Sequence, residues 1–166
     1  MNASTDPSRK KPRRREATPA QRALGLLVRR EHSKLELTRK LLARGIPEEE
    51  AAAAVGKMAQ AGWQDDIRFA CSLARTRASA GYGPLRIRAE IQSHGLGAEA
   101  VEAAFVALAE AGEDDWHARA AELVRRRFGA SRAAPLATQR KAADFLLRRG
   151  FDSDCVRAAI KPPLED

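Results

Sequence analysis

The residues of this 166-residue chain best suited to chemistry are its arginines, and the chemistry is the recognition of anions. A guanidinium group binds carboxylates and phosphates through a planar fork of N–H donors and stays charged at physiological pH. Clustered arginines therefore predict contacts with an acidic protein surface or with nucleic acid. The candidate contact residues are Arg29, Arg30, Arg68, Arg75, Arg77, Tyr82, Arg86, Arg88, Arg125, Arg126 and Arg127.

A second basic cluster lies in an N-terminal tail, residues 1–17. Like charges, a proline and the absence of apolar periodicity predict that this tail is disordered. It is either a solubilising extension or an arm that contacts acidic surfaces or phosphates. The residues expected to contact phosphates are Arg9, Lys10, Lys11, Arg13, Arg14 and Arg15.

No pattern in the sequence predicts catalysis, a metal or a cofactor. His32, His94 and His117 are widely separated and lack metal-ligand spacing. The acidic pairs 65–66 and 114–115 stand where helix N-caps are needed, and capping explains them better than metal binding does. No Gly-Lys-Ser/Thr follows the glycine-rich turn at 81–84, which argues against a phosphate-binding loop. We therefore predict a binding protein, not an enzyme.

The two cysteines and the hydropathy pattern predict where the protein works. Cys71 and Cys155 are far apart, so we expect reduced thiols that pack as small apolar side chains. The sequence has no apolar run long enough to span a membrane and no secretory signal. We expect a cytoplasmic protein with no membrane partner and, because no long dimer seam is visible, a monomer.

A motif that occurs three times predicts the elements that position these residues. Each copy has two apolar residues on one helical face, a helix-ending glycine and a further apolar residue. The glycines are Gly45, Gly95 and Gly150. Such repetition, in an alanine-rich sequence without a strand pattern, predicts an all-α fold. We expect three tandem three-helix (helix-turn-helix-like) repeats that form an elongated, curved array.

Helix signals place the repeats at 18–63, 64–112 and 113–166. The first helix is expected to end near Glu31. The predicted N-caps are Thr18 before Pro19, Ser33 in capping-box spacing with Glu36, Asp65, Asp114 or Asp115, and Asp152. The residues expected in the core include Trp63, Phe69, Leu73 and Ile87.

The net charge of +8 and the pI near 10.2 indicate a polyanionic partner. Basic residues concentrate on the first and second helices of each repeat, whereas the third helices are acidic. The third helix would enter the major groove if these were conventional DNA-reading units, and its carboxylates would repel phosphates. Stacked repeats would instead present a cationic stripe that recognises shape and charge.

Two interpretations of the arginines stay open. They contact a partner, or about half of them face solvent or pair with the acidic third helices of the chain itself. Tyr82 either anchors an interface or packs inside its own turn.

Several segments resemble one bacterial family. The block GWQDDIRFA at 62–70, the block GPLRI at 83–87 and the segment at 90–96 resemble the central part of the RecX family, and residues 24–45 also fit. The resemblance covers essentially all of residues 18–161, is looser in the third repeat, and excludes the basic tail.

The resemblance implies a cytoplasmic, non-enzymatic regulator of the RecA recombinase, with a role in recombination, DNA repair and the SOS response. Members lodge in the helical groove of the RecA–DNA filament and inhibit its ATPase, strand-exchange and co-protease activities. The DNA of the filament is a possible secondary contact. The alternative is a protein that binds single- or double-stranded DNA directly, with the cationic stripe and the tail on phosphates. Direct binding to DNA would weaken steeply with salt.

Overall fold

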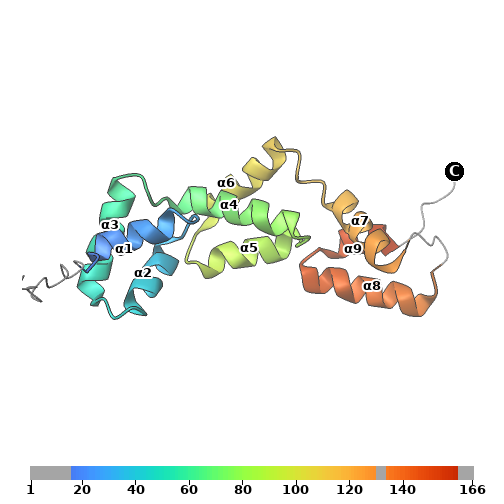
Figure 1. The fold of residues 1–166 in the computed structure, drawn as a ribbon. Coiled ribbons are helices and arrows are strands. Elements are labelled where there is room, and N and C mark those ends of the chain that lie inside the picture. The colour runs from blue at the N-terminus through green and yellow to red at the C-terminus, as the bar shows by residue number, and fades with distance from the viewer. Residues whose placement is uncertain (1–15, 130–133, 161–166) are drawn as a thin grey trace, which may run out of the picture.

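The computed structural model describes residues 16–129 and 134–160, and all the regular elements within those ranges are helices. They are α1 (Pro19–Leu27), α2 (Lys34–Leu42), α3 (Glu48–Gln60), α4 (Asp66–Ser79), α5 (Pro84–Ser93), α6 (Ala98–Glu110), α7 (Trp116–Phe128), α8 (Leu136–Arg149) and α9 (Ser153–Ile160). We call α1–α3 module 1, α4–α6 module 2 and α7–α9 module 3. The modules follow one another in an elongated row (Figure 1), which confirms the predicted all-α repeat fold.

Each module has a small apolar core of its own. Within a module the third helix packs against the first, and the second helix closes the remaining side. The apolar residues of the repeated motif lie inside: Leu37 and Leu41 in module 1, Ile87 and Ile91 in module 2, and Leu146 in module 3 are fully buried. The repeats therefore share one packing plan.

Side-chain caps begin many of the helices as predicted. The Thr18 hydroxyl accepts from the Gln21 backbone N–H, and the Gln21 side chain accepts from the Thr18 N–H in return. Carboxylates of Asp65, Asp115 and Asp152 each accept from the backbone N–H three residues further on. These contacts satisfy N–H groups that have no partner within the helix.

The first helix ends earlier than predicted. It stops at Leu27, not near Glu31, so Arg29 and Arg30 lie on the connection to α2 instead of on a helix. The helix ends early because of His32, which is buried and whose Nδ1 forms a hydrogen bond with the carbonyl of Arg30. The connection instead places the imidazole against Lys40 and Glu36 of α2, and the His32 carbonyl where Gln64 donates to it.

Modules 1 and 2 meet through polar side chains, a contact that we call joint 1. The Ser33 hydroxyl, which also accepts from the Glu36 backbone N–H, lies 2.8 Å from Nδ1 of His94 at the end of α5. The amide of Gln64 donates to the carbonyl of His32 across the same boundary. These buried side chains fix the direction in which module 2 leaves module 1.

Trp63 was expected in the core, and that prediction is wrong, because 52% of the residue is exposed. Its backbone N–H donates to the Met58 carbonyl and finishes the end of α3. The inward position is the next one, where the buried Gln64 reaches joint 1. A polar junction, not an apolar core, occupies the space that hydrophobicity alone would assign to tryptophan.

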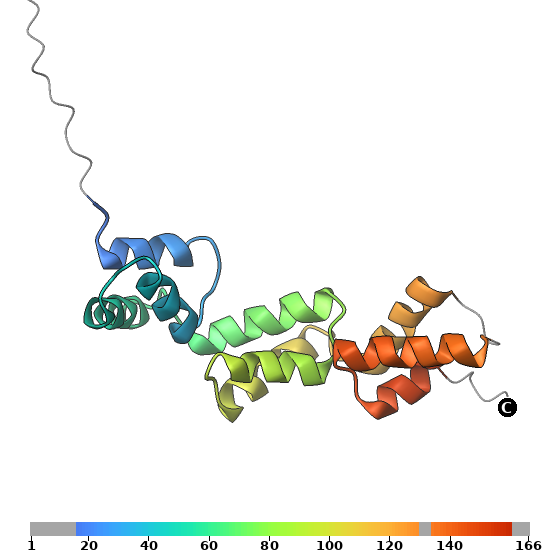
Figure 2. The same ribbon diagram turned by 90° about the horizontal axis from the view of Figure 1, so that it is seen from below.

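Modules 2 and 3 meet through backbone, a contact that we call joint 2. The N–H of Gly83 donates to the carbonyl of Arg149 over 2.7 Å, and the N–H of Leu85 donates to the carbonyl of Gly150 over 3.0 Å. The end of α8 therefore abuts the start of α5, and the two helices follow one another along the molecule (Figure 2). The carbonyl end of one helix dipole meets the amide end of the next.

Module 1 should lose stability as the pH falls below about 6.5, the usual pKa of histidine. Burial lowers the pKa of His32, and the positive charges of Arg30 and of Lys40, whose Nζ lies 3.1 Å from Nε2, act in the same direction; together they outweigh the hydrogen bond from Nδ1–H to the Arg30 carbonyl, which raises it. The unfolded chain therefore takes up the proton first, so the contribution of neutral His32 is complete above the unfolded pKa and declines below it. Urea unfolding should show that the free energy of unfolding falls less between pH 7.5 and pH 5.5 in His32→Gln than in the native chain. If the free energy of unfolding falls as much in His32→Gln as in the native chain, His32 is not the titrating group. His117→Gln, on the exposed side of α7, is the control.

Candidate interaction surface

The candidate arginines divide into two groups, and each arginine of the first group is paired with a carboxylate of the chain itself. The ion pairs are Arg30 with Glu36, Arg68 with Glu31, Arg77 with Glu90, and Arg125 and Arg126 with Glu122. These carboxylates lie on first and second helices or on a connection, not on the third helices. Within the described ranges, none of the candidate arginines pairs with a carboxylate of α3, α6 or α9, so the internal partners lie elsewhere than that alternative placed them.

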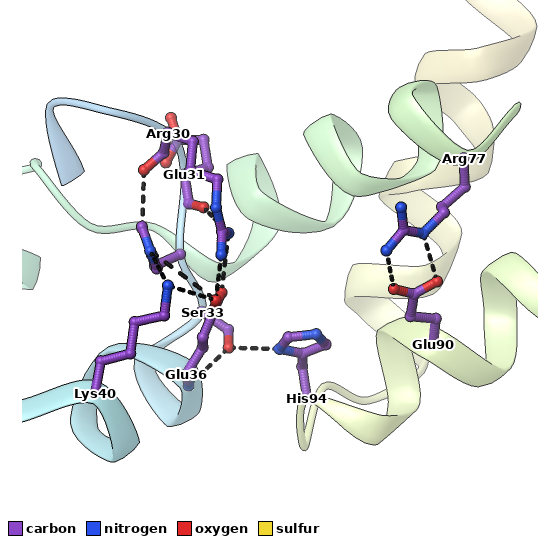
Figure 3. Close-up of polar contacts among 9 residues, drawn as sticks. Arg30, Glu31, Ser33, Glu36, Lys40, Arg77, Glu90 and His94 are labelled. Carbon is purple, nitrogen blue, oxygen red and sulfur yellow. Dashed lines mark hydrogen bonds and ion pairs between the residues drawn. The ribbon is translucent and has the colours of Figure 1, made fainter. Parts of the chain in front are cut away.

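The pair between Arg77 and Glu90 pins α4 to α5. Nε and Nη2 of Arg77 donate to the two carboxylate oxygens of Glu90 over 2.7 and 2.6 Å (Figure 3). These hydrogen bonds hold the pKa of Glu90 below its usual range and raise the pKa of Arg77. The planar fork is used up by this contact, which leaves Arg77 less able to bind a partner.

Glu90→Gln should remove part of the acid sensitivity of the fold. The folded pKa of Glu90 is depressed, so its contribution is present above the unfolded pKa of about 4.3 and is lost as the pH falls through the folded value. Both partners are partly exposed, and we expect roughly 0.5–1 kcal/mol. Unfolding free energies at pH 6 and pH 3 should differ less in the variant by that amount. An unchanged difference would show that the pair contributes nothing to stability.

A second internal cluster surrounds Glu36 at joint 1. Partial burial raises the pKa of this carboxyl, but hydrogen bonds from Arg30 and Lys40 and the nearby His32 outweigh burial, and the pKa is lowered. Figure 3 shows Arg30, Glu36 and Lys40 converging from α2 and the preceding connection. Arg30 therefore stabilises module 1 through its ion pair with Glu36.

The second group of arginines keeps its charge. Arg29, Arg75, Arg86, Arg88 and Arg127 are exposed and form no ion pair with any residue of 16–129 or 134–160. The guanidinium of Arg88 lies 4.8 Å from the ring centroid of Phe105. Stacking on a ring holds a guanidinium in place without using its N–H donors.

Tyr82 lies at joint 2 and has both a packing role and an accessible edge. It is half-buried, and the guanidinium carbons of Arg86 and Arg149 each lie 4.9 Å from its ring centroid, with that of Arg77 at 5.9 Å. Arg149 is not among the candidate residues that the sequence predicts. The only feature of the sequence that points to this residue is its position just before Gly150. Its neighbours at joint 2 are far away in the chain, so no local pattern indicates the contact.

The acidic residues of the third helices form a separate surface. None of the acidic residues of α3 and α6 forms an ion pair inside the described segments, whereas Asp154 on α9 pairs with Arg157 of the same helix. On α3 and α6 the exposed carboxylates are those of Glu48, Glu49, Glu50, Glu99, Glu102 and Glu110. The free carboxylates of α3 and α6 thus lie on other helices than the free arginines Arg75, Arg86, Arg88 and Arg127.

Comparison with known proteins decides the family. Sequence models of the first, second and third three-helix domains of RecX match residues 21–58, 65–104 and 113–160. The chain belongs to the RecX family. The curated "Regulatory protein RecX" of Stenotrophomonas maltophilia (strain R551-3) is 56% identical over 165 residues, which covers 99% of both chains. That of Xanthomonas campestris pv. campestris (strain B100) is 58% identical over 161 residues, or 96% of this chain and 97% of the relative.

Solved RecX structures share the fold. A crystal structure of RecX from Lactobacillus salivarius has a TM-score of 0.66 at 21% identity and covers 86% of this chain and 92% of its own. A second RecX crystal structure has a TM-score of 0.69 at 23% identity over 84% of this chain and 69% of its own. The family relation makes this chain a regulatory protein.

The remaining predictions concern thiols, metals, membranes and the tail. Cys71 and Cys155 are free thiols, and burial raises the pKa of Cys155 to about 11. Across the described residues we find no cluster of three or more potential metal ligands, and no helix there is long and apolar enough to cross a bilayer. The tail contacts predicted at 9–15 lie outside the described residues.

Proposed function

We propose that this RecX-family protein binds the RecA–DNA filament in its helical groove, as a cytoplasmic monomer, and inhibits the ATPase, strand-exchange and co-protease activities of RecA. The observation that carries the proposal is the set of exposed arginines left without an internal carboxylate. Module 1 supplies Arg29, module 2 supplies Arg75, Arg86 and Arg88, and module 3 supplies Arg127.

An elongated row of modules suits a repeating target. Each module carries at least one uncompensated cation, so one molecule can contact several neighbouring protomers of a polymer. Linked weak contacts raise the overall affinity steeply when the spacing allows them to form together. Inhibition of this kind needs area and charge and requires no catalytic residue.

Direct binding to DNA is the second candidate. The arginine stacks at Phe105 and Tyr82 favour it, because guanidinium groups held on aromatic rings are suited to phosphates. DNA binding of this type would occur without RecA and would decline steeply with salt.

The test is the ATPase rate of RecA on single-stranded DNA with this protein at well below one molecule per RecA. The proposal predicts strong inhibition that persists at a salt concentration where binding to bare DNA, measured by fluorescence anisotropy, has disappeared. Inhibition that vanishes together with DNA binding would favour the second candidate. No inhibition at any ratio would contradict the proposal.

A further inference from the structure

Joint 2 is crossed by a row of alternating arginines and aromatic rings, which we call the arginine ladder: Arg127, Phe145, Arg149, Tyr82 and Arg86. The Arg127 and Arg149 guanidinium carbons lie 5.0 and 5.2 Å from the Phe145 ring centroid. Those of Arg149 and Arg86 both lie 4.9 Å from the Tyr82 centroid. Arg149 belongs to module 3 and Arg86 to module 2, so the ladder bridges two modules.

The ladder leaves N–H donors without partners at the joint. The Arg86 guanidinium forms no hydrogen bond with the described part of the chain. Of the Arg149 guanidinium only Nη1 is engaged, and it donates to the Ala80 carbonyl over 2.8 Å. An open groove of about 420 Å³ beside Tyr82 is lined by Arg77, Arg86 and Glu90. Glu90 is already bound to Arg77 and does not neutralise Arg86.

Two like charges therefore flank one neutral ring across a boundary between modules. Their guanidinium carbons are at most about 10 Å apart, since each is 4.9 Å from the same centroid. Repulsion between them opposes closure of the joint, and a polyvalent anion between them would convert it into attraction. Long arginine side chains can turn toward a shared oxyanion and bind it through two N–H groups each.

We propose that joint 2 is a binding site for a phosphate-type oxyanion, held between Arg86 and Arg149 beside Tyr82, and that its occupancy closes modules 2 and 3 onto each other. The shared chemistry is a tetrahedral phosphorus oxyanion, either free phosphate or a phosphodiester of nucleic acid. The site does not depend on RecA. Its occupancy would set how rigid the row of modules is.

The joint contains its own reporters of closure. The amides of Gly83 and Leu85 donate across the boundary to the carbonyls of Arg149 and Gly150, so they exchange with solvent when the joint opens. An anion that binds only the closed joint slows this exchange by the factor 1 + c/Kd, where c is the free anion concentration. Concentrations about ten times the dissociation constant should slow both amides roughly tenfold.

The experiment is hydrogen exchange of the full chain by NMR, with inorganic phosphate compared against chloride at equal ionic strength. The proposal predicts slower exchange at Gly83 and Leu85 in phosphate. The Val101 amide, bonded within module 2 to Gly97, should not respond. Equal exchange in the two salts, with short oligothymidylate also without effect, overturns the proposal. Slowing by oligothymidylate alone identifies a phosphodiester as the ligand, and slowing by inorganic phosphate identifies the free ion.

Two variants separate the site from general charge. Arg86→Gln makes no change to hydrogen bonds among the described residues and should abolish the response to the anion. Arg148→Gln removes the same charge one residue before Arg149, at an exposed position outside the ladder, and should leave the response intact. Equal responses in both variants would contradict a site at Arg86.

Discussion

Replacing Gly83 with alanine should open joint 2. A Cβ at this position would lie 2.4 Å from the Gly150 carbonyl oxygen and 2.5 Å from the Phe151 nitrogen. Both are backbone atoms, so no rotamer change can relieve the overlap. The two hydrogen bonds across the joint should be lost together, at a cost of about 2 kcal/mol. Small-angle scattering should show a larger radius of gyration, and the Gly83→Ala chain should lose protection at Leu85.

Gly97→Ala is the matched control for this change. Gly83 and Gly97 precede α5 and α6 with nearly the same backbone, φ of −85° and −86°, and a Cβ at Gly97 would meet nothing within 4 Å. The control changes the same residue type at the same helix position without touching another module. Scattering profiles that are alike for both variants would contradict the described joint.

The glycine on the other side of joint 2 gives an independent comparison. Gly150 and Gly45 both end a middle helix in the left-handed region, with φ of +86° and +78°. Alanine costs about 1–2 kcal/mol at either position because of that backbone. Only at Gly150 would its Cβ also collide with module 2, at 2.4 Å from Cβ of Arg86, so Gly150→Ala should cost more than Gly45→Ala.

The sequence predicts well whatever depends on neighbouring residues. Helical periodicity explains the repeated burial of residues such as Leu41 and Ile91. Caps such as Asp65 and Asp152 follow from the need of the first backbone N–H groups of a helix for a hydrogen-bond acceptor. These features were predicted because each partner lies within a few positions in the chain. They determine the helices and their grouping, and with these the fold.

Contacts between modules could not be predicted in this way. Buried polar residues such as His32 and Gln64 end a helix early and displace Trp63 to the surface, and their partners lie far away in sequence. Arg149 joins the candidate surface only because α8 abuts α5. The charge pattern indicates that the arginines are candidate contact residues. Only the three-dimensional structure shows that Arg77 is paired with Glu90 whereas Arg75 is exposed and has no ion pair in the described chain.

That separation changes which substitutions can test an interface. Reversing the charge of Arg77 would leave two acidic side chains facing each other between α4 and α5, so a lost activity would have a structural cause. Arg75 and Arg88 have no ion-pair partner in the described chain, so changing them leaves no carboxylate without its cation. They are the cleaner probes of a surface that binds an acidic partner.

The double variant Arg75→Gln/Arg88→Gln should weaken inhibition of the RecA ATPase by roughly 30-fold. Interface arginines commonly contribute about 1 kcal/mol each, and two such losses correspond to that factor in affinity. The measurement is the concentration of protein that halves the ATPase rate, with thermal unfolding checked in parallel because Arg88 also stacks on Phe105.

Arg125→Gln/Arg126→Gln is the control of equal charge. Both arginines are bound to Glu122, and these hydrogen bonds lower the pKa of that carboxyl to about 2, so their charge is already engaged. We expect a change of less than about threefold, because a paired surface cation contributes little to binding elsewhere. An equal loss in both double variants would mean that inhibition follows net charge alone. No loss in either would remove Arg75 and Arg88 from the interface, and the basis for choosing contacts by their lack of internal partners would fail with them.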